Sequence, residues 1–235
     1  MKKPNITKFD RAGFFSTDIK PELDRAASLC REHGIPFFYT ACVKNSADAS
    51  EYVWDAVTPE SLGLSLCKDM IWKHICVANG DEAVPSLGED VEMTLNKKPV
   101  DGSREKPVEL TAFDKRDFFE KEVRRILRPL TARCGIYKIP FFYTACVENL
   151  ADISIGYASN VISPYSREVT LYDDRISRHI DVSVGFAIIH TRTAVGSNVR
   201  DLVDGNEMDG DEFDDSMFDD LFAEPSERFD YGEDF

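Results

Sequence analysis

The chain has 235 residues, 43% of them hydrophobic, which excludes a wholly disordered protein and allows one or two domains with a substantial core. Its formal net charge of −15 excludes a broadly basic protein, but residues 201–235 alone hold fifteen acids and one base, whereas residues 97–200 carry a surplus of four bases. No stretch approaches the ~20 apolar residues of a membrane helix, and the N-terminal MKKPNITKF lacks the apolar core of a signal peptide, so we expect a cytoplasmic protein that does not bind a membrane.

The chain contains an internal repeat. The nonamer IPFFYTACV occurs at residues 35–43 and again at residues 139–147. When the chain is compared with itself at an offset of 104, and then 105, the match covers roughly residues 20–84, the first repeat, and residues 122–189, the second repeat. Two copies are too few for a solenoid. We therefore expect four segments, listed here in order: a first unit at 1–84, a linker at 85–113, a second unit at 114–193 and an acidic, largely disordered tail at 194–235.

Each repeat is expected to begin with a helix. Apolar residues follow helical spacing over about 21–32, and again up to Leu130 in the second repeat. Gly34 and Gly135 stand where these helices should end. Pro129 is expected to end or kink the second helix early, because proline has no N–H to donate within a helix.

The repeated nonamer predicts a strand at 36–43, since it is aromatic and β-branched with proline at its first position. Alternation places Phe37 and Tyr39 on one face and Phe38 and Thr40 on the other, and both faces are largely apolar, so the strand should be central and covered on both sides. A second strand is expected at 52–57 and 155–162, and then a helix within 66–78 and 171–189, although residues 179–184 also alternate as a strand would. The predicted fold is α+β, a tandem duplication of an α-β-β-α unit with pseudo-twofold symmetry.

Asp69 and His74 of the first repeat recur as Asp174 and His179. An Asp–His pair can orient a general base or supply half of a metal site. Five residues along a helix place two side chains about 140° apart, which is poor geometry for one shared ion. The favoured interpretation is structural, with each Asp as a helix N-cap or ion-pair partner and each His as a half-buried hydrogen-bonding group. If the repeats face each other, His74 and His179 meet.

No other pattern predicts catalysis. The six cysteines include no CxxC pair and are expected to be reduced and mostly buried. Phosphate-binding loops and hydrolase motifs are absent from the sequence. We therefore predict no catalytic residue, no metal and no cofactor, and we keep an enzyme with a site between the repeats as an alternative.

Basic residues gather at the first helix of the second repeat, mixed with acids. Such a helix is usually a solvated face. The functional alternative is a contact surface for a nucleic-acid backbone, formed by Lys121, Arg124, Arg125 and Arg128.

The acidic tail carries apolar residues at helical spacing. Phe213, Met217 and Leu221 lie four apart, beside Phe218 and Phe222, which are also four apart. One apolar stripe among acids suits a segment that folds into the groove of a partner, although a purely solubilising tail is the alternative. The last residues place Phe229, Tyr231 and Phe235 among further acids.

These last twenty or so residues resemble the acidic C-terminal peptides of bacterial and phage single-stranded-DNA-binding proteins. The resemblance implies docking on replication and repair partners. This chain departs from the bacterial pattern, since it ends in Gly232-Glu233-Asp234-Phe235 and not in Ile-Pro-Phe. Its body also lacks the five-stranded barrel pattern of that family.

The leading hypothesis is a non-enzymatic binding or adaptor protein. Its tail would dock on the basic groove of a protein partner, and its body would bind single-stranded nucleic acid weakly as an accessory in DNA metabolism. An alternative is a phage or mobile-element anti-defence protein whose tail mimics nucleic acid. The sequence leaves the oligomeric state open.

Overall fold

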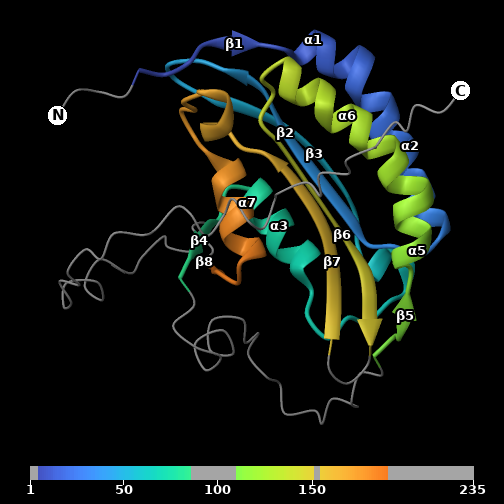
Figure 1. Cartoon of the computed structure of the whole chain (residues 1–235). Helices are drawn as coiled ribbons and strands as arrows, with labels where there is room; N and C mark the ends of the chain where they lie inside the picture. Colours follow the sequence, from blue (N-terminus) through green and yellow to red (C-terminus); the bar gives the residue numbers. More distant parts are fainter. Residues whose placement is uncertain (1–4, 86–109, 151–153, 190–235) are drawn as a thin grey trace, which may run out of the picture. The chain divides into compact units, whose positions relative to one another are not determined.

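The computed structural model describes residues 5–85, 110–150 and 154–189, all within one compact unit. These residues form a mixed α+β fold in which a six-stranded antiparallel sheet lies between two helical layers (Figure 1). Helices α1, α2, α5 and α6 cover one face of the sheet, and α3 and α7 cover the other (Figure 1). The predicted tail and most of the predicted linker lie outside the described residues.

The elements before residue 85 recur in the same order after residue 110. The first set is β1 (Phe9–Asp10), α1 (Ala12–Phe14), η1 (Phe15–Ile19), α2 (Lys20–Glu32), β2 (Phe37–Asn45), β3 (Ser50–Val57), η2 (Glu60–Leu62), α3 (Met70–Ala78) and β4 (Glu82–Val84). The second set is β5 (Phe113–Asp114), α5 (Arg116–Phe118), η3 (Phe119–Val123), α6 (Arg124–Ile136), β6 (Phe141–Leu150), β7 (Ser154–Ile162), η4 (Tyr165–Arg167), α7 (Arg175–Ser183) and β8 (Ala187–Ile189). The segments η1 and η3 are π-helical, and η2 and η4 are 3₁₀-helical.

The two repeated nonamers are the central strands of the main sheet. Strand β2 pairs antiparallel with β6, and Tyr39 lies directly opposite Tyr143. Strand β3 pairs with the other edge of β2, and β7 with the other edge of β6. The short strands β1 and β5 pair antiparallel with the C-terminal ends of β2 and β6. Strand β4 pairs with β8 in a separate two-stranded sheet. Each repeat therefore contributes half of one continuous sheet.

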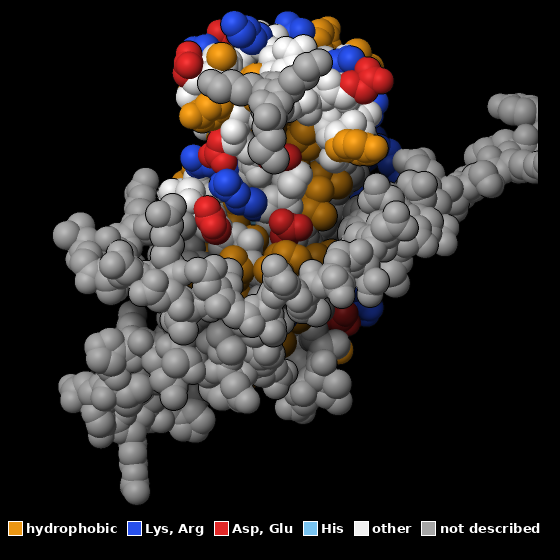
Figure 2. Space-filling model, turned by 90° about the vertical axis from the view of Figure 1, so that its left-hand side faces the viewer, with side chains coloured by type: hydrophobic (Ala, Val, Ile, Leu, Met, Phe, Trp, Pro, Cys, Tyr) orange, Lys and Arg blue, Asp and Glu red, His pale blue; other side chains and the backbone are white. Residues whose placement is uncertain are grey.

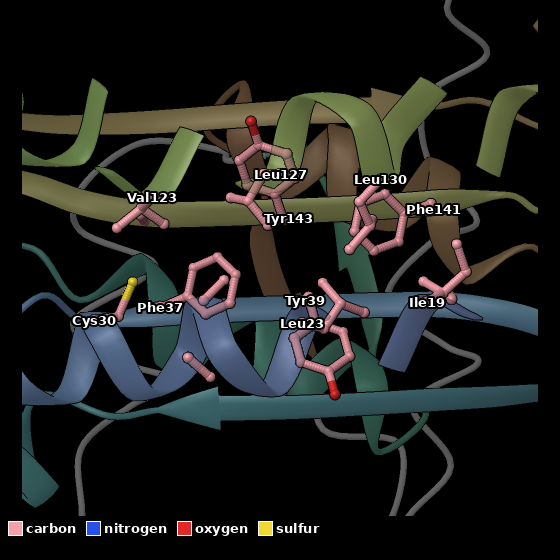
Figure 3. Packing of buried hydrophobic residues seen from close by; sticks show 14 of the residues in the cluster. Ile19, Leu23, Cys30, Phe37, Tyr39, Val123, Leu127, Leu130, Phe141 and Tyr143 are labelled. Carbon is pink, nitrogen blue, oxygen red and sulfur yellow. The ribbon is translucent and has the colours of Figure 1, made fainter. Parts of the chain in front are cut away.

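The alternation expected within the nonamers is confirmed. Phe37 and Tyr39 join the large apolar cluster formed with α2 and α6, whereas Phe38 belongs to the cluster formed with α3 and α7. Figure 3 shows the first cluster, in which side chains of α2 and α6 meet those of β2 and β6. Both faces of the central strands are buried, so β2 and β6 are central strands covered on both sides, as the sequence indicates.

Each repeat anchors the helix of the other. The hydroxyl of Tyr52 in β3 donates to the carbonyl of Asp173 at 2.6 Å and accepts from the N–H of Arg175 at the start of α7. Reciprocally, the hydroxyl of Tyr157 in β7 donates to the carbonyl of Lys68 at 2.8 Å and accepts from the N–H at the start of α3. Asn45 and Asn149 make a second reciprocal pair of side-chain bonds, to the backbone at Thr170 and Tyr172 and at Ser65 and Cys67. The two repeats are therefore interlocked.

Pro129 does not end the helix of the second repeat early, because α6 continues to Ile136. Pro129 and Arg125 are both exposed, so water can replace the donor that the Arg125 carbonyl loses.

Gly135 lies inside the last turn of α6 and is buried, whereas Gly34 follows α2 in the left-handed region with φ of 65°. A Cβ on Gly135 would lie 2.9 Å from Nη2 of Arg167, so glycine here makes room for that guanidinium. The segment that also alternated like a strand is helical over Arg175–Ser183.

Candidate functional site

Asp69 and Asp174 cap the two helices that cover one face of the sheet. The carboxylate of Asp69 accepts from the N–H of Trp72 at 3.0 Å, and that of Asp174 accepts from the N–H of Ser177 at 3.0 Å. Each bond satisfies an N–H that the first turn of a helix leaves free. The N-cap role expected for both residues is confirmed, and neither carboxylate is paired with the histidine five residues later.

His74 and His179 instead meet each other. Their Nδ1 atoms lie 3.1 Å apart, and both rings are buried between the sheet and helices α3 and α7. Phe38 stacks on His74 with ring centroids 5.5 Å apart, and Phe142 stacks on His179 at 5.3 Å. The expectation that the histidines are half-buried is wrong, because the crossing of α3 and α7 closes over both rings. These four residues, Phe38, His74, Phe142 and His179, are called the His–Phe cluster below.

Burial keeps the histidine pair neutral. Desolvation, followed by the charge of Lys73, lowers the pKa of His74 to about 3. Desolvation also lowers the pKa of His179, with further contributions from His74, Arg175 and Arg178. One Nδ1 must then carry the proton and the other must accept it. Nε2 of His179 has no hydrogen-bond partner among the described residues, so the proton on His179 sits on Nδ1, which avoids a buried, unpaired N–H.

This geometry suits packing better than chemistry. A general base needs a pKa near the working pH and access to its substrate, and the His pair has neither. Two imidazoles supply only two of the four ligands of a structural zinc ion. Within residues 5–85, 110–150 and 154–189, no three His, Cys, Asp or Glu side chains gather around one point. A histidine that binds a metal also normally donates its other N–H, which His179 does not do.

The cysteines are free thiols, and five of the six are buried. Burial raises the pKa of Cys30, Cys42, Cys134 and Cys146 to about 12 and that of Cys76 to about 11. A nucleophilic thiol requires the opposite shift. Cys67 is the exposed member of the set.

The predicted cationic residues lie along the outer layer of helices. Lys121 lies 3.7 Å from Asp117 and Arg124 3.0 Å from Glu120, each in an i, i+4 pair. Arg125 and Arg128 are exposed, and no carboxylate in the described part of the chain lies within ion-pair distance of either. The structure therefore divides the predicted set into two paired cations and two that are open to a ligand.

The equivalent helix of the first repeat has a different charge. Helix α6 contains four arginines and no acid, whereas α2 contains three bases and three acids. On the opposite side of the molecule, which carries α3 and α7, acidic and basic side chains are interspersed with apolar ones (Figure 2). The surplus of positive charge is thus a property of α6 that its counterpart α2 does not share.

The predicted partner-binding residues of the tail lie outside the described residues; they are Phe213, Met217, Phe218, Leu221, Phe222, Phe229, Tyr231 and Phe235.

Nothing in the sequence indicates an exposed aromatic contact between Phe14 and Tyr137, because these two residues are far apart in the chain. Their ring centroids lie 3.9 Å apart at the C-terminal end of α6. Placing residues 14 and 137 together requires knowledge that the two outer helices run side by side.

None of the helices in the described part of the chain is long and apolar enough to span a bilayer.

Comparison of the chain with protein-family models, with curated proteins and with solved structures finds no match.

Proposed function

We propose that the protein is a non-enzymatic adaptor. Its acidic-aromatic tail docks on the basic groove of a protein partner, and its body, a duplicated unit with pseudo-twofold symmetry, contacts the phosphates of single-stranded nucleic acid through α6. The body serves as a rigid scaffold, and the two binding functions belong to segments of opposite charge.

The observation that carries this proposal is the separation of charge. Residues 201–235 hold fifteen of the 43 acids of the chain, while α6 holds four arginines and no acid. Arginine presents a planar set of donors that matches phosphate oxygens. Arg125 and Arg128 are the members of this set that are exposed and have no carboxylate of the described residues within ion-pair distance.

Binding of a labelled oligothymidine at several salt concentrations tests the nucleic-acid part. Removing residues 201–235 deletes a net charge of −14, so it should raise the affinity and steepen its dependence on salt. Replacing Arg125 and Arg128 by Ala should lower the slope of log K against log salt by about 0.7 for each phosphate that is no longer neutralised. Arg25→Ala on α2 is the matched control. The absence of binding by both the full and the shortened chain at low salt would refute this part.

Affinity purification tests the tail. The captured partner should be lost when Phe213, Met217, Phe218, Leu221 and Phe222 are replaced by Ala with every acid retained. A partner that remains bound to this variant is held by charge alone, and the proposed apolar stripe is then wrong. Capture of the same partner by a chain that lacks residues 201–235 would refute the role of the tail altogether.

A further inference from the structure

The residue after the last turn of α6, Tyr137, has an exposed aromatic ring that contacts a second ring on one side. Tyr137 is 44% exposed, and its ring lies at 31° to that of Phe14 with centroids 3.9 Å apart. Phe14 thus supports one side of the tyrosine ring. Ile136 beside it is 76% exposed. A ring held in place in this way loses little conformational entropy when a planar ligand stacks on it.

The residue after this ring is a cation in an unusual backbone conformation. Lys138 has φ of 52°, at the position where the first repeat has Gly34 with φ of 65°. The left-handed region costs a residue with a side chain about 1–2 kcal/mol, and glycine avoids that cost. Glu168 replaces Gly63 in the same manner, so the conformation alone does not mark a site. At position 138 the residue in this conformation is a lysine, and it directly follows Tyr137 in the chain.

Further cations line the approach to this ring. Arg133 is one turn before Tyr137 on the same side of the helix. Arg125 is exposed two turns before Arg133 and is turned about 80° from it around the axis of α6. Arg128, nine residues before Tyr137, projects from the opposite side of the helix axis, so it does not line this approach. Arg125 and Tyr137 are twelve residues apart, or about 18 Å along a helix, the length of about five stacked nucleotides of one strand.

A second pair of stacked rings lies at the opposite end of the outer helical layer and can be compared with Tyr137 and Phe14. There His33 stacks on Phe118 with centroids 3.8 Å apart, in the positions that correspond to Tyr137 and Phe14. The hollow around this pair is also lined by two acids and two bases, Asp114, Lys115, Arg116 and Asp117. Arg116 is held by Asp114 at 2.6 Å and by Glu148 at 3.2 Å. Only one of the two aromatic pairs therefore adjoins a helix with a surplus of cations and no acids.

We propose that Tyr137, supported by Phe14 and near Arg133 and Lys138 in the chain, is a base-stacking platform for single-stranded nucleic acid whose phosphates follow Arg133 and Arg125 along α6. This inference rests on the proposed nucleic-acid binding by α6 and adds the place at which a base is bound. Stacking requires an unpaired base, so the platform selects a single strand over a duplex.

The test uses the full chain and fluorescence anisotropy of a labelled oligothymidine, with a duplex of the same length and polyglutamate as competitors. Stacking of a base on an aromatic side chain contributes about 1–3 kcal/mol, so Tyr137→Ala should weaken binding about 5- to 150-fold, whereas Tyr137→Phe should retain it. His33→Ala, at the corresponding ring, should leave the affinity unchanged. Lys138→Gly should raise the melting temperature and weaken binding, a combination that a purely structural role of Lys138 does not produce.

Three results would overturn the platform. If Arg125→Ala with Arg128→Ala abolishes binding while Tyr137→Ala changes nothing, the phosphate surface stands and the platform is wrong. If the duplex or polyglutamate competes as well as the unlabelled single strand, α6 binds polyanions in general and no base is stacked. If the unaltered chain binds no oligothymidine, the proposed nucleic-acid function and the platform fail together.

Discussion

Acid should unfold this protein through one buried pair of histidines. His74 and His179 are neutral in the folded state, whereas in an unfolded chain each has a pKa near 6.5. As the pH falls below 6.5, the two histidines take up protons in the unfolded state but stay neutral in the folded state, so the free energy of unfolding falls with pH. Above that pH both states hold neutral imidazole, and the stability does not depend on these groups.

The size of the effect follows from the unfolded pKa once the folded pKa lies well below 5. Between pH 7 and pH 5, each histidine then costs about 2 kcal/mol, and the pair costs about 4 kcal/mol. This is a large part of the roughly 5–15 kcal/mol that stabilises a typical domain. Burial raises the pKa of Asp69 and of Asp181. These two groups favour the folded state as the pH falls, so they oppose the loss of stability that the histidines cause.

Urea unfolding followed by tryptophan fluorescence at several pH values between 7.5 and 5 measures this dependence. His74→Leu together with His179→Leu should remove most of it, because no titrating group then remains in the His–Phe cluster. His33→Asn, at an exposed histidine, should leave the dependence in place. A wild-type stability that is flat from pH 7 to pH 5, or a double variant with the same slope as wild type, would refute the reasoning.

Three further predictions concern the interlocked fold. Tyr52→Phe leaves the carbonyl of Asp173 and the N–H of Arg175 without their partner, so it should lower the free energy of unfolding by about 1–3 kcal/mol. The control Tyr165→Phe, at a residue that is 87% exposed, should change this free energy by less than about 0.5 kcal/mol. Denaturant unfolding midpoints of the two variants measure the difference. A thiol reagent should modify Cys67 at once and the five buried cysteines only after denaturant is added, and rapid reaction of two or more thiols in the native protein would contradict their placement. Cleavage at a protease site introduced between residues 85 and 110 should leave the two fragments together on gel filtration, because β2 pairs with β6; separation of folded fragments would contradict this.

The sequence predicted local structure well because the signals were local. Alternation within IPFFYTACV placed Phe37 and Phe38 on opposite, buried faces, and the structure confirms both. The five-residue spacing of Asp69 and His74 correctly predicted that the two side chains do not act together, because five residues along a helix place them about 140° apart. Asp69 caps the helix, and His74 contacts His179.

What the sequence could not predict depends on partners distant in the chain. The reason for glycine at position 135 could not be predicted, because the guanidinium for which it makes room comes from Arg167. The depth of burial of His74 depends on α7, which belongs to the other repeat. The aromatic contact of Tyr137 depends on Phe14 in α1, which lies 123 positions earlier in the chain.

The pairing of β2 with β6 also bears on how the chain is synthesised. The central residues Tyr39 and Tyr143 are 104 positions apart, so at ~5–20 residues per second the ribosome makes the second strand about 5–20 s after the first. During that interval an apolar strand waits with one edge unpaired, and an identical strand on a neighbouring nascent chain offers the same edge. Polysomes that bring such chains close together would favour mispairing between molecules, so the yield of native protein should depend on translation rate and chaperone supply more than on the stability of the finished fold.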